Sequence, residues 1–190
     1  MKKEIITITG TLGSGKSSAA NFAAKELGYE RFSAGDFFRK IGIDLGISIN
    51  EVNKRAETDM KIDEMTDAEV RKAGKEMNKV VIDSRLAFHF IPESFKVYLD
   101  LPEEIAKERI LNDLKENKLR QQSEDSATSE EIYKKIVSRL ESERKRYKEL
   151  YGVDRNDKNN FDLVIDTKKN DLRQVANIIV TEYKKWIEKN

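Results

Sequence analysis

The feature that most constrains this sequence is a glycine-rich run near its amino terminus, residues 10–17 (GTLGSGKS). The run follows an apolar stretch at 5–9 typical of a short buried strand, and it precedes an Ala-rich stretch at 18–27 typical of a helix. Strand, glycine loop and helix in this order form the setting of a phosphate-binding loop. We therefore predict that the chain binds a nucleoside triphosphate.

The residue types in this loop suit that chemistry. Its glycines let several backbone N–H groups point into one concavity, and the positive end of the following helix strengthens the field there. Lys16 is expected to reach the β- and γ-phosphates, and the Ser17 hydroxyl to complete the coordination of Mg²⁺. The predicted ATP-binding residues are Gly10, Gly13, Ser14, Gly15, Lys16, Ser17 and Ser18.

Length and composition bound the class of protein. A chain of 190 residues is expected to form a single domain, 1–190. Its net charge of +1 gives no electrostatic argument for nucleic acid or membrane partners, and the absence of cysteine excludes disulfides and thiolate metal sites. No apolar run approaches the roughly 20 residues of a membrane helix. The first strand begins too early for a signal peptide, so a cytoplasmic location is expected.

Strand-like segments alternate with helical stretches along the chain. Beyond 5–9, we predict strands at 29–33, 80–83, 95–100 and 162–166. The runs at 80–82 and 163–165 are continuously apolar, as in strands that are buried on both faces of a parallel sheet. The alternation predicts a three-layer α/β/α domain with a five-stranded parallel sheet, whose ligands bind beyond the carboxyl ends of the strands.

Two long stretches interrupt this alternation. Residues 41–74 are mostly helical and lie between the second and third strands, and residues 116–152 lie between the fourth and fifth. Within the second stretch, 117–129 is rich in Gln, Ser and acids and is expected to form an exposed, mobile turn. The single Trp186, on the apolar stripe of the last helix, and the single His89 are expected to be structural residues.

Polar side chains follow the second and third strands, at the edge where ligands should bind. Gly35 permits close backbone approach, and Arg39 can offer a planar fork of donors to a phosphate. The alternative is a solvated Arg39 near a helix start that Asp36 helps to cap. After the third strand, Asp83 either orients Mg²⁺ through water or pairs with a cation, and Arg85 points from the same rim.

The helix expected at 129–151 carries a cationic segment. Within eight positions it has Arg139, Arg144, Lys145 and Arg146. These residues either form a solvated face with i,i+4 ion pairs such as Glu141–Lys145, or close over a transferring phosphoryl group. For phosphoryl transfer a protein must align the two substrates and neutralise their charge, and it needs no nucleophilic side chain of its own. The phosphate loop, the strand-end arginines and this helix together predict that reaction.

Several motifs resemble the cytidylate kinases, a family of P-loop nucleoside monophosphate kinases, especially the short form found in archaea and some bacteria. The motifs are SAGDFFR at 33–39, AETD at 56–59 leading to Ile62-Asp63, DSRLA at 83–87, YLD at 98–100, RYKELYGVD at 146–154 and DLVIDT at 162–167. The first and the fifth are the most specific. The resemblance covers the chain from residue 4 to its end.

The resemblance implies a P-loop kinase fold with a helical monophosphate-binding arm at 41–74 and an arginine-bearing lid region at 116–152. It assigns Lys16 and Ser17 to ATP and Mg²⁺, Arg39 and Arg85 to the phosphate of the acceptor, and Arg139 and Arg146 to the transferring group. Asp59 and Asp63 either accept from the exocyclic amine of cytosine or belong to a polar helix surface. Our predicted set is thus Lys16, Arg139 and Arg146 for catalysis, Gly35, Arg39, Asp59, Asp63 and Arg85 for the acceptor, and Ser17 and Asp83 for the metal.

The leading hypothesis is phosphoryl transfer from MgATP to CMP or dCMP, giving ADP and CDP or dCDP. The resemblance implies a monomer that acts on small nucleotides, and the near-zero net charge and the lack of a long apolar run predict no nucleic acid or membrane partner. Two departures from the family bear on the acceptor, namely Ser84 in place of a usual Gly and a longer segment at 116–129. The alternatives are the same fold acting on AMP, UMP or a small alcohol, and a slow ATPase that serves as a switch or binding module.

Overall fold

The computed structural model describes residues 3–116 and 128–189. Its sheet has the strand order β2-β3-β1-β4-β5, and all neighbouring strands pair in parallel. The strands are β1 (Ile5–Gly10), β2 (Glu30–Ser33), β3 (Val80–Asp83), β4 (Phe95–Asp100) and β5 (Leu163–Asp166). The five-stranded parallel sheet predicted from the sequence is therefore confirmed.

The burial of the strands follows their place in the sheet. β1 and β3 are buried along their whole length, as their apolar runs predict. β5 was also expected to be buried on both faces, and this prediction is wrong, because Val164 is 41% exposed. β5 forms one edge of the sheet, where β4 is its only neighbouring strand among the described residues. A continuous apolar run therefore does not distinguish a central strand from an edge strand here.

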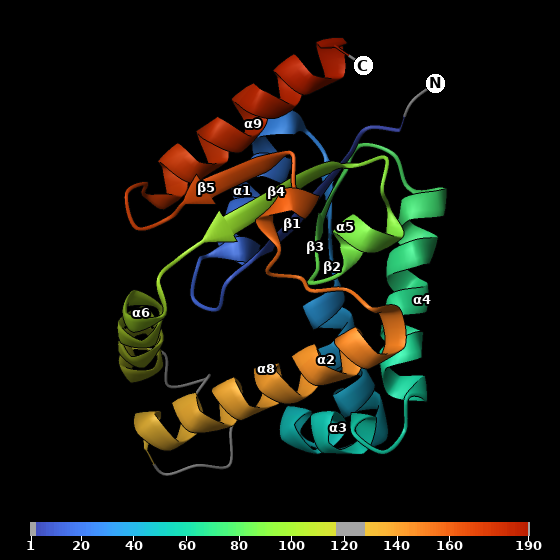
Figure 1. Ribbon diagram of the computed structural model, residues 1–190, viewed down its shortest axis with the longest axis vertical. Coiled ribbons are helices and arrows are strands. Elements are labelled where there is room, and N and C mark those ends of the chain that lie inside the picture. Colours follow the sequence, from blue (N-terminus) through green and yellow to red (C-terminus); the bar gives the residue numbers. More distant parts are fainter. Residues whose placement is uncertain (1–2, 117–127, 190) are drawn as a thin grey trace.

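Helices cover both faces of the sheet (Figure 1). On one face, α1 (Lys16–Leu27) and α9 (Leu172–Lys189) share a core with residues of β1 and β4. On the other face, α4 (Lys61–Glu76) and α5 (Ala87–Phe90) pack against β1 and β3. Trp186 of α9 packs against Phe95, with ring centroids 5.5 Å apart. It therefore belongs to the core, as predicted.

Helices beyond the carboxyl ends of the strands occupy the two stretches that the sequence predicts as an arm and a lid region. The arm contains α2 (Ala34–Leu45), α3 (Ile49–Ala56) and the first part of α4, joined by a small apolar core around Val52. Opposite the arm lies α6 (Glu103–Glu116), and the long α8 (Ser129–Tyr151) passes from α6 to the arm (Figure 1). A 3₁₀ turn, η1 (Lys158–Asn160), precedes β5. Of the predicted mobile turn at 117–129, residues 117–127 lie outside the described residues.

The position of α8 follows from its ends and its apolar side. Thr128 and Glu131 form a capping box, in which the Glu131 N–H donates to Thr128 Oγ1 at 3.2 Å. Gly152 ends the helix with a φ of 67°, which favours glycine. Ile132 and Ile136 are buried against Ile110 of α6. With this face packed, the polar side of α8 is held across the opening at the carboxyl ends of the strands.

Candidate active site

The phosphate-binding loop connects β1 to α1, as predicted. Gly10 is required because a Cβ there would lie 2.4 Å from the carbonyl oxygen of Leu99 in β4. Gly15 has a φ of 81°, in the left-handed region, and stands at the start of α1. The loop therefore turns tightly, and the N-terminus of α1 points toward the space beyond the carboxyl ends of the strands.

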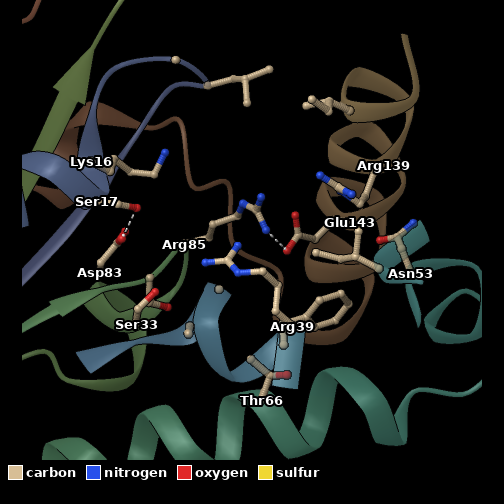
Figure 2. Close-up of a pocket in the computed structure, with 18 of the residues that line it drawn as sticks. Lys16, Ser17, Ser33, Arg39, Asn53, Thr66, Asp83, Arg85, Arg139 and Glu143 are labelled. Carbon is tan, nitrogen blue, oxygen red and sulfur yellow. Dashed lines mark hydrogen bonds and ion pairs between the residues drawn. The ribbon is translucent and has the colours of Figure 1, made fainter. Parts of the chain in front are cut away.

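A cavity of about 470 Å³ adjoins this loop (Figure 2). Lys16, Ser17 and Asp83 lie on one side of it, and Arg139 and Glu143 of α8 lie on the other, with Arg85 and Arg39 between them. The predicted residues that line the cavity are Gly13, Gly15, Lys16, Ser17, Ser18, Gly35, Arg39, Asp83, Arg85 and Arg139. The predicted residues outside its lining are Gly10, Ser14, Asp59, Asp63 and Arg146. One space thus joins the loop to most of the predicted arginines.

Ser17 and Asp83 bring two side-chain oxygen groups together near the end of β3. The hydroxyl of Ser17 donates to Asp83 Oδ2 at 2.6 Å, and Arg31 Nη2 lies 3.2 Å from the same oxygen. The pairing with a cation that the sequence left open is thus present. A hydroxyl and a carboxylate side by side also suit Mg²⁺, which prefers oxygen ligands and keeps several places for water and phosphate.

Lys16 lies in a strongly charged environment. Burial lowers the pKa of its ammonium group to about 8, the nearby carboxylate of Asp83 opposes this change, and the cations Arg85 and Arg155 add to it. A polyphosphate beside Lys16 would reverse the effect of burial by supplying negative charge. The site is therefore electrostatically suited to an anion.

Arg155 is a further cation close enough to affect Lys16, and the sequence analysis did not select it. Its Nε is buried without a hydrogen-bond partner, and the part of the chain that the structure describes contains no carboxylate in ion-pair contact with it. Burial and the neighbouring Arg85 lower the pKa of its guanidinium. Arg155 directly follows the RYKELYGVD motif at 146–154 without belonging to it, and only the three-dimensional structure shows that its charge acts on Lys16.

Both arginines predicted to bind the acceptor, Arg39 and Arg85, are held by carboxylates of the chain. Arg39 pairs with Asp36, and its side chain is 55% exposed at the cavity wall. Ser33 caps α2 by accepting from the Asp36 N–H at 3.2 Å. Arg85 pairs with Glu143 of α8, a residue that the sequence analysis did not select. An incoming phosphate can replace these carboxylates as the partner of each guanidinium.

Glu143 is nearly buried and only partly satisfied. Its Oε1 accepts from Arg85 and, at 3.1 Å, from the Tyr147 hydroxyl, whereas its Oε2 is buried and has no hydrogen-bond partner. The expected pair between Glu141 and Lys145 is not among the ion pairs formed by residues 3–116 and 128–189. The cationic segment of α8 therefore contributes an acid, as well as arginines, to the cavity.

The arginines of α8 have different surroundings. Arg139 lines the cavity and donates to Asn50 Oδ1 at 3.3 Å. Arg144 lies on the surface, 3.1 Å from Asp154. Arg146 is buried away from the cavity lining, and its Nε donates to Asp63 Oδ2 at 2.6 Å. In this conformation Arg146 joins α8 to the arm instead of facing the phosphate loop.

The acids Asp59 and Asp67 have different surroundings. Asp59 is exposed, and its carboxylate accepts from the Lys61 N–H at 3.1 Å. Asp67, which the sequence analysis did not select, lines the cavity and is 3% exposed.

Ser84, which stands where the family usually has Gly, also lines the cavity, and its hydroxyl accepts from the Leu86 N–H at 3.3 Å. His89 is exposed beside the ring of Phe90 and lies outside the cavity lining.

Comparison with known proteins agrees with this architecture. Residues 6–151 match a family model described as an AAA domain. The chain is 35% identical over 184 residues to a cytidylate kinase of Natronomonas pharaonis, covering 94% of this chain and 90% of the relative. It is also 35% identical over 175 residues to a cytidylate kinase of Methanocella arvoryzae, covering 92% and 94%.

The chain belongs to the cytidylate kinase family. A solved shikimate kinase from Bacteroides thetaiotaomicron shares its fold, with a TM-score of 0.62 and 14% sequence identity over 97% of this chain and 98% of that one. The P-loop kinase fold predicted from the sequence is thus confirmed. Within the described ranges, no helix of this kinase is long and apolar enough to cross a membrane.

Proposed function

We propose that this kinase transfers the γ-phosphoryl group of MgATP to CMP or dCMP, producing ADP and CDP or dCDP. The observation that carries the proposal is the single cavity shared by the phosphate loop and by Arg39 and Arg85. Its family membership supports a cytidine nucleotide as the acceptor. A P-loop alone would fit many ATP-binding proteins, whereas two further arginines facing it fit a second phosphorylated substrate.

The donor end of the cavity would hold the triphosphate. Lys16 and the backbone of the loop would neutralise the β- and γ-phosphates, and Ser17 with Asp83 would hold Mg²⁺. When bound, the ion would supply positive charge that stabilises the charge developing on the leaving oxygen. Bound phosphates would favour the protonated form of Lys16, because their negative charge would stabilise the ammonium group that burial has removed from water.

The acceptor end would hold the monophosphate on Arg39 and Arg85. For this to happen, Arg85 exchanges Glu143 for a phosphate oxygen, and Arg39 exchanges Asp36. An oxygen of the acceptor phosphate then forms a bond to the γ-phosphorus while the bond from that phosphorus to the bridging oxygen of ADP breaks. The arginines align the two substrates and spread the charge of the transferred group.

The assignments on α8 and in the arm stay predictions. Arg139 already lines the cavity and is suited to the transferring group. Arg146 can act there only if its contact with Asp63 breaks when the substrates bind. Asp63 can contact the base of the acceptor only if it also releases Arg146. The exposed Asp59 can contact the base only if the arm closes over the nucleotide. We also expect the enzyme to be a cytoplasmic monomer.

The decisive experiment measures ADP release in a coupled assay with MgATP and each of CMP, dCMP, UMP, AMP and GMP. Strong stimulation by CMP or dCMP is expected, together with a loss of about 100-fold or more in R39Q and R85Q, because each removes a charged phosphate contact. Stimulation only by another monophosphate would keep the kinase and replace its substrate. Slow ADP release that no acceptor stimulates would instead support the ATPase alternative.

A further inference from the structure

The cavity continues from the phosphate contacts into the arm. Figure 2 places Lys16 at one end, Arg39 further along, and Thr66 of α4 beyond Arg39. Phe38, which precedes Arg39 in α2, and Asp67, which follows Thr66 in α4, also line this cavity. If the arginines hold a monophosphate, its base would lie in the adjoining space in the arm.

Asp67 offers one carboxylate oxygen to this space. Its side chain is buried, and its Oδ2 accepts from the Tyr151 hydroxyl at 2.6 Å. Within residues 3–116 and 128–189 no other hydrogen bond to the Asp67 carboxyl is formed, so Oδ1 remains as an acceptor. Burial raises the pKa of Asp67 to about 6, and the carboxyl is therefore ionised and purely an acceptor near pH 7.5.

The two acids predicted to bind the acceptor, Asp59 and Asp63, and the cavity acid Glu143 are less well placed to contact a base. Both oxygens of Asp63 accept from Arg146, at 2.6 and 3.4 Å. Asp59 is exposed and outside the cavity lining. Glu143 holds Arg85 and thus belongs to the phosphate end. Asp67 is therefore the acid best placed to contact a base.

We propose that Asp67 selects the acceptor by accepting a hydrogen bond from the exocyclic amino group of cytosine. This inference rests on the proposed function, since it concerns the base of the same acceptor nucleotide. Uracil has a carbonyl oxygen where cytosine has its amine, so the carboxylate of Asp67 would face a lone pair instead of a donor. The ring of Phe38 supplies an apolar wall for the base. Asp67 is thus a specificity-determining residue.

The test compares kcat/KM for CMP and UMP in the wild type, D67N, D67E and the matched control E64Q, since Glu64 is an exposed acid of the same helix outside the cavity lining. In D67N, the side-chain carbonyl keeps the Tyr151 hydroxyl and leaves the amide N–H groups for the base, which favours uracil. We expect the CMP-to-UMP ratio of kcat/KM to fall about 100-fold or more in D67N, because a site built for one hydrogen-bond pattern rejects the reversed one. D67E should keep the preference for CMP at a lower rate, and E64Q should leave both values within about twofold.

The outcomes separate this inference from the proposed function. Equal losses with CMP and UMP in D67N would mean a structural role for Asp67 and overturn the inference, as would an unchanged ratio. A wild-type enzyme that CMP does not stimulate would overturn the proposed function itself, and the inference with it. AMP is tested as a further acceptor, because adenine also carries an exocyclic amine but is a larger base than cytosine. The melting temperature of each variant shows whether it is folded, and D67E keeps the test decisive if D67N is not.

Discussion

The contact between Arg146 and Asp63 predicts that replacing Arg146 by methionine strongly destabilises the protein. Arg146 makes bonds of 2.6 and 3.4 Å to Asp63, 2.7 Å to Ser142 and 3.4 Å to Asn53. The side chains of Arg146 and Asp63 are only 9% and 2% exposed. R146M would thus leave a carboxylate buried without its partner.

Removing one member of a buried ion pair costs about 3–5 kcal/mol in the free energy of unfolding. For a protein of this size, each kcal/mol lowers the melting temperature by about 2–4 °C, so R146M should melt about 6–20 °C below the wild type. Differential scanning calorimetry at pH 7 measures this directly. The control is R144M, because Arg144 pairs with Asp154 on the surface, where an ion pair contributes about 0–1 kcal/mol. The double variant D63N/R146M should recover much of the loss.

The pH dependence of R146M gives an independent check. Burial raises the pKa of Asp63 even with Arg146 present, and losing the cation raises it further. A carboxyl with a raised pKa binds its proton more readily in the folded state than in the unfolded state, so folding gains stability as the pH falls toward the unfolded value of about 4. The gap between R146M and the wild type should therefore narrow at acidic pH. A variant that melts with the wild type at pH 7 would refute the buried ion pair.

Three further predictions concern the cavity and α8. MgATP should bind more weakly above about pH 8, because the Lys16 pKa of about 8 implies loss of its proton there; titration calorimetry from pH 7 to 9 should show this in the wild type and a flat profile in K16M. E143Q should bind CMP several-fold more tightly in equilibrium titrations, since the phosphate no longer competes with a carboxylate for Arg85, and weaker binding would contradict this competition. I132A should lower the free energy of unfolding by about 2–5 kcal/mol in urea titrations, because Ile132 is 1% exposed where α8 packs on α6, and a loss below about 1 kcal/mol would argue against this packing.

The sheet and the phosphate loop could be predicted because their signals are local. A short apolar strand, a glycine run and a helix lie next to one another in the sequence, and their order alone defines the loop. The edge position of β5 was missed, because an apolar run at 163–165 carries no information about which strands flank it. Pairing order is decided by long-range packing that no short window contains.

The acceptor side was predicted less completely for the same reason. Arg39 and Arg85 follow strand ends, so their placement at the cavity could be inferred from topology. The contact of Arg85 with Glu143 joins residues 58 positions apart, and that of Arg146 with Asp63 joins residues 83 positions apart. A charged helix such as α8 gives no sign of which charges face inward, and Asp67 has no sequence signal that separates it from Asp63.

The long helix α8 has a mechanical consequence for catalysis. Its start is fixed to α6 through Ile132, and its later turns are fixed to the arm through Arg146. Glu143 lies 11 residues beyond Ile132, about 16 Å at the rise of an α-helix, so a rotation of about 10° at the α6 end moves it by about 3 Å. While the contact between Arg146 and Asp63 holds, a movement of the arm is therefore passed along α8 to Arg139, so the position of Arg139 in the cavity depends on the position of the arm.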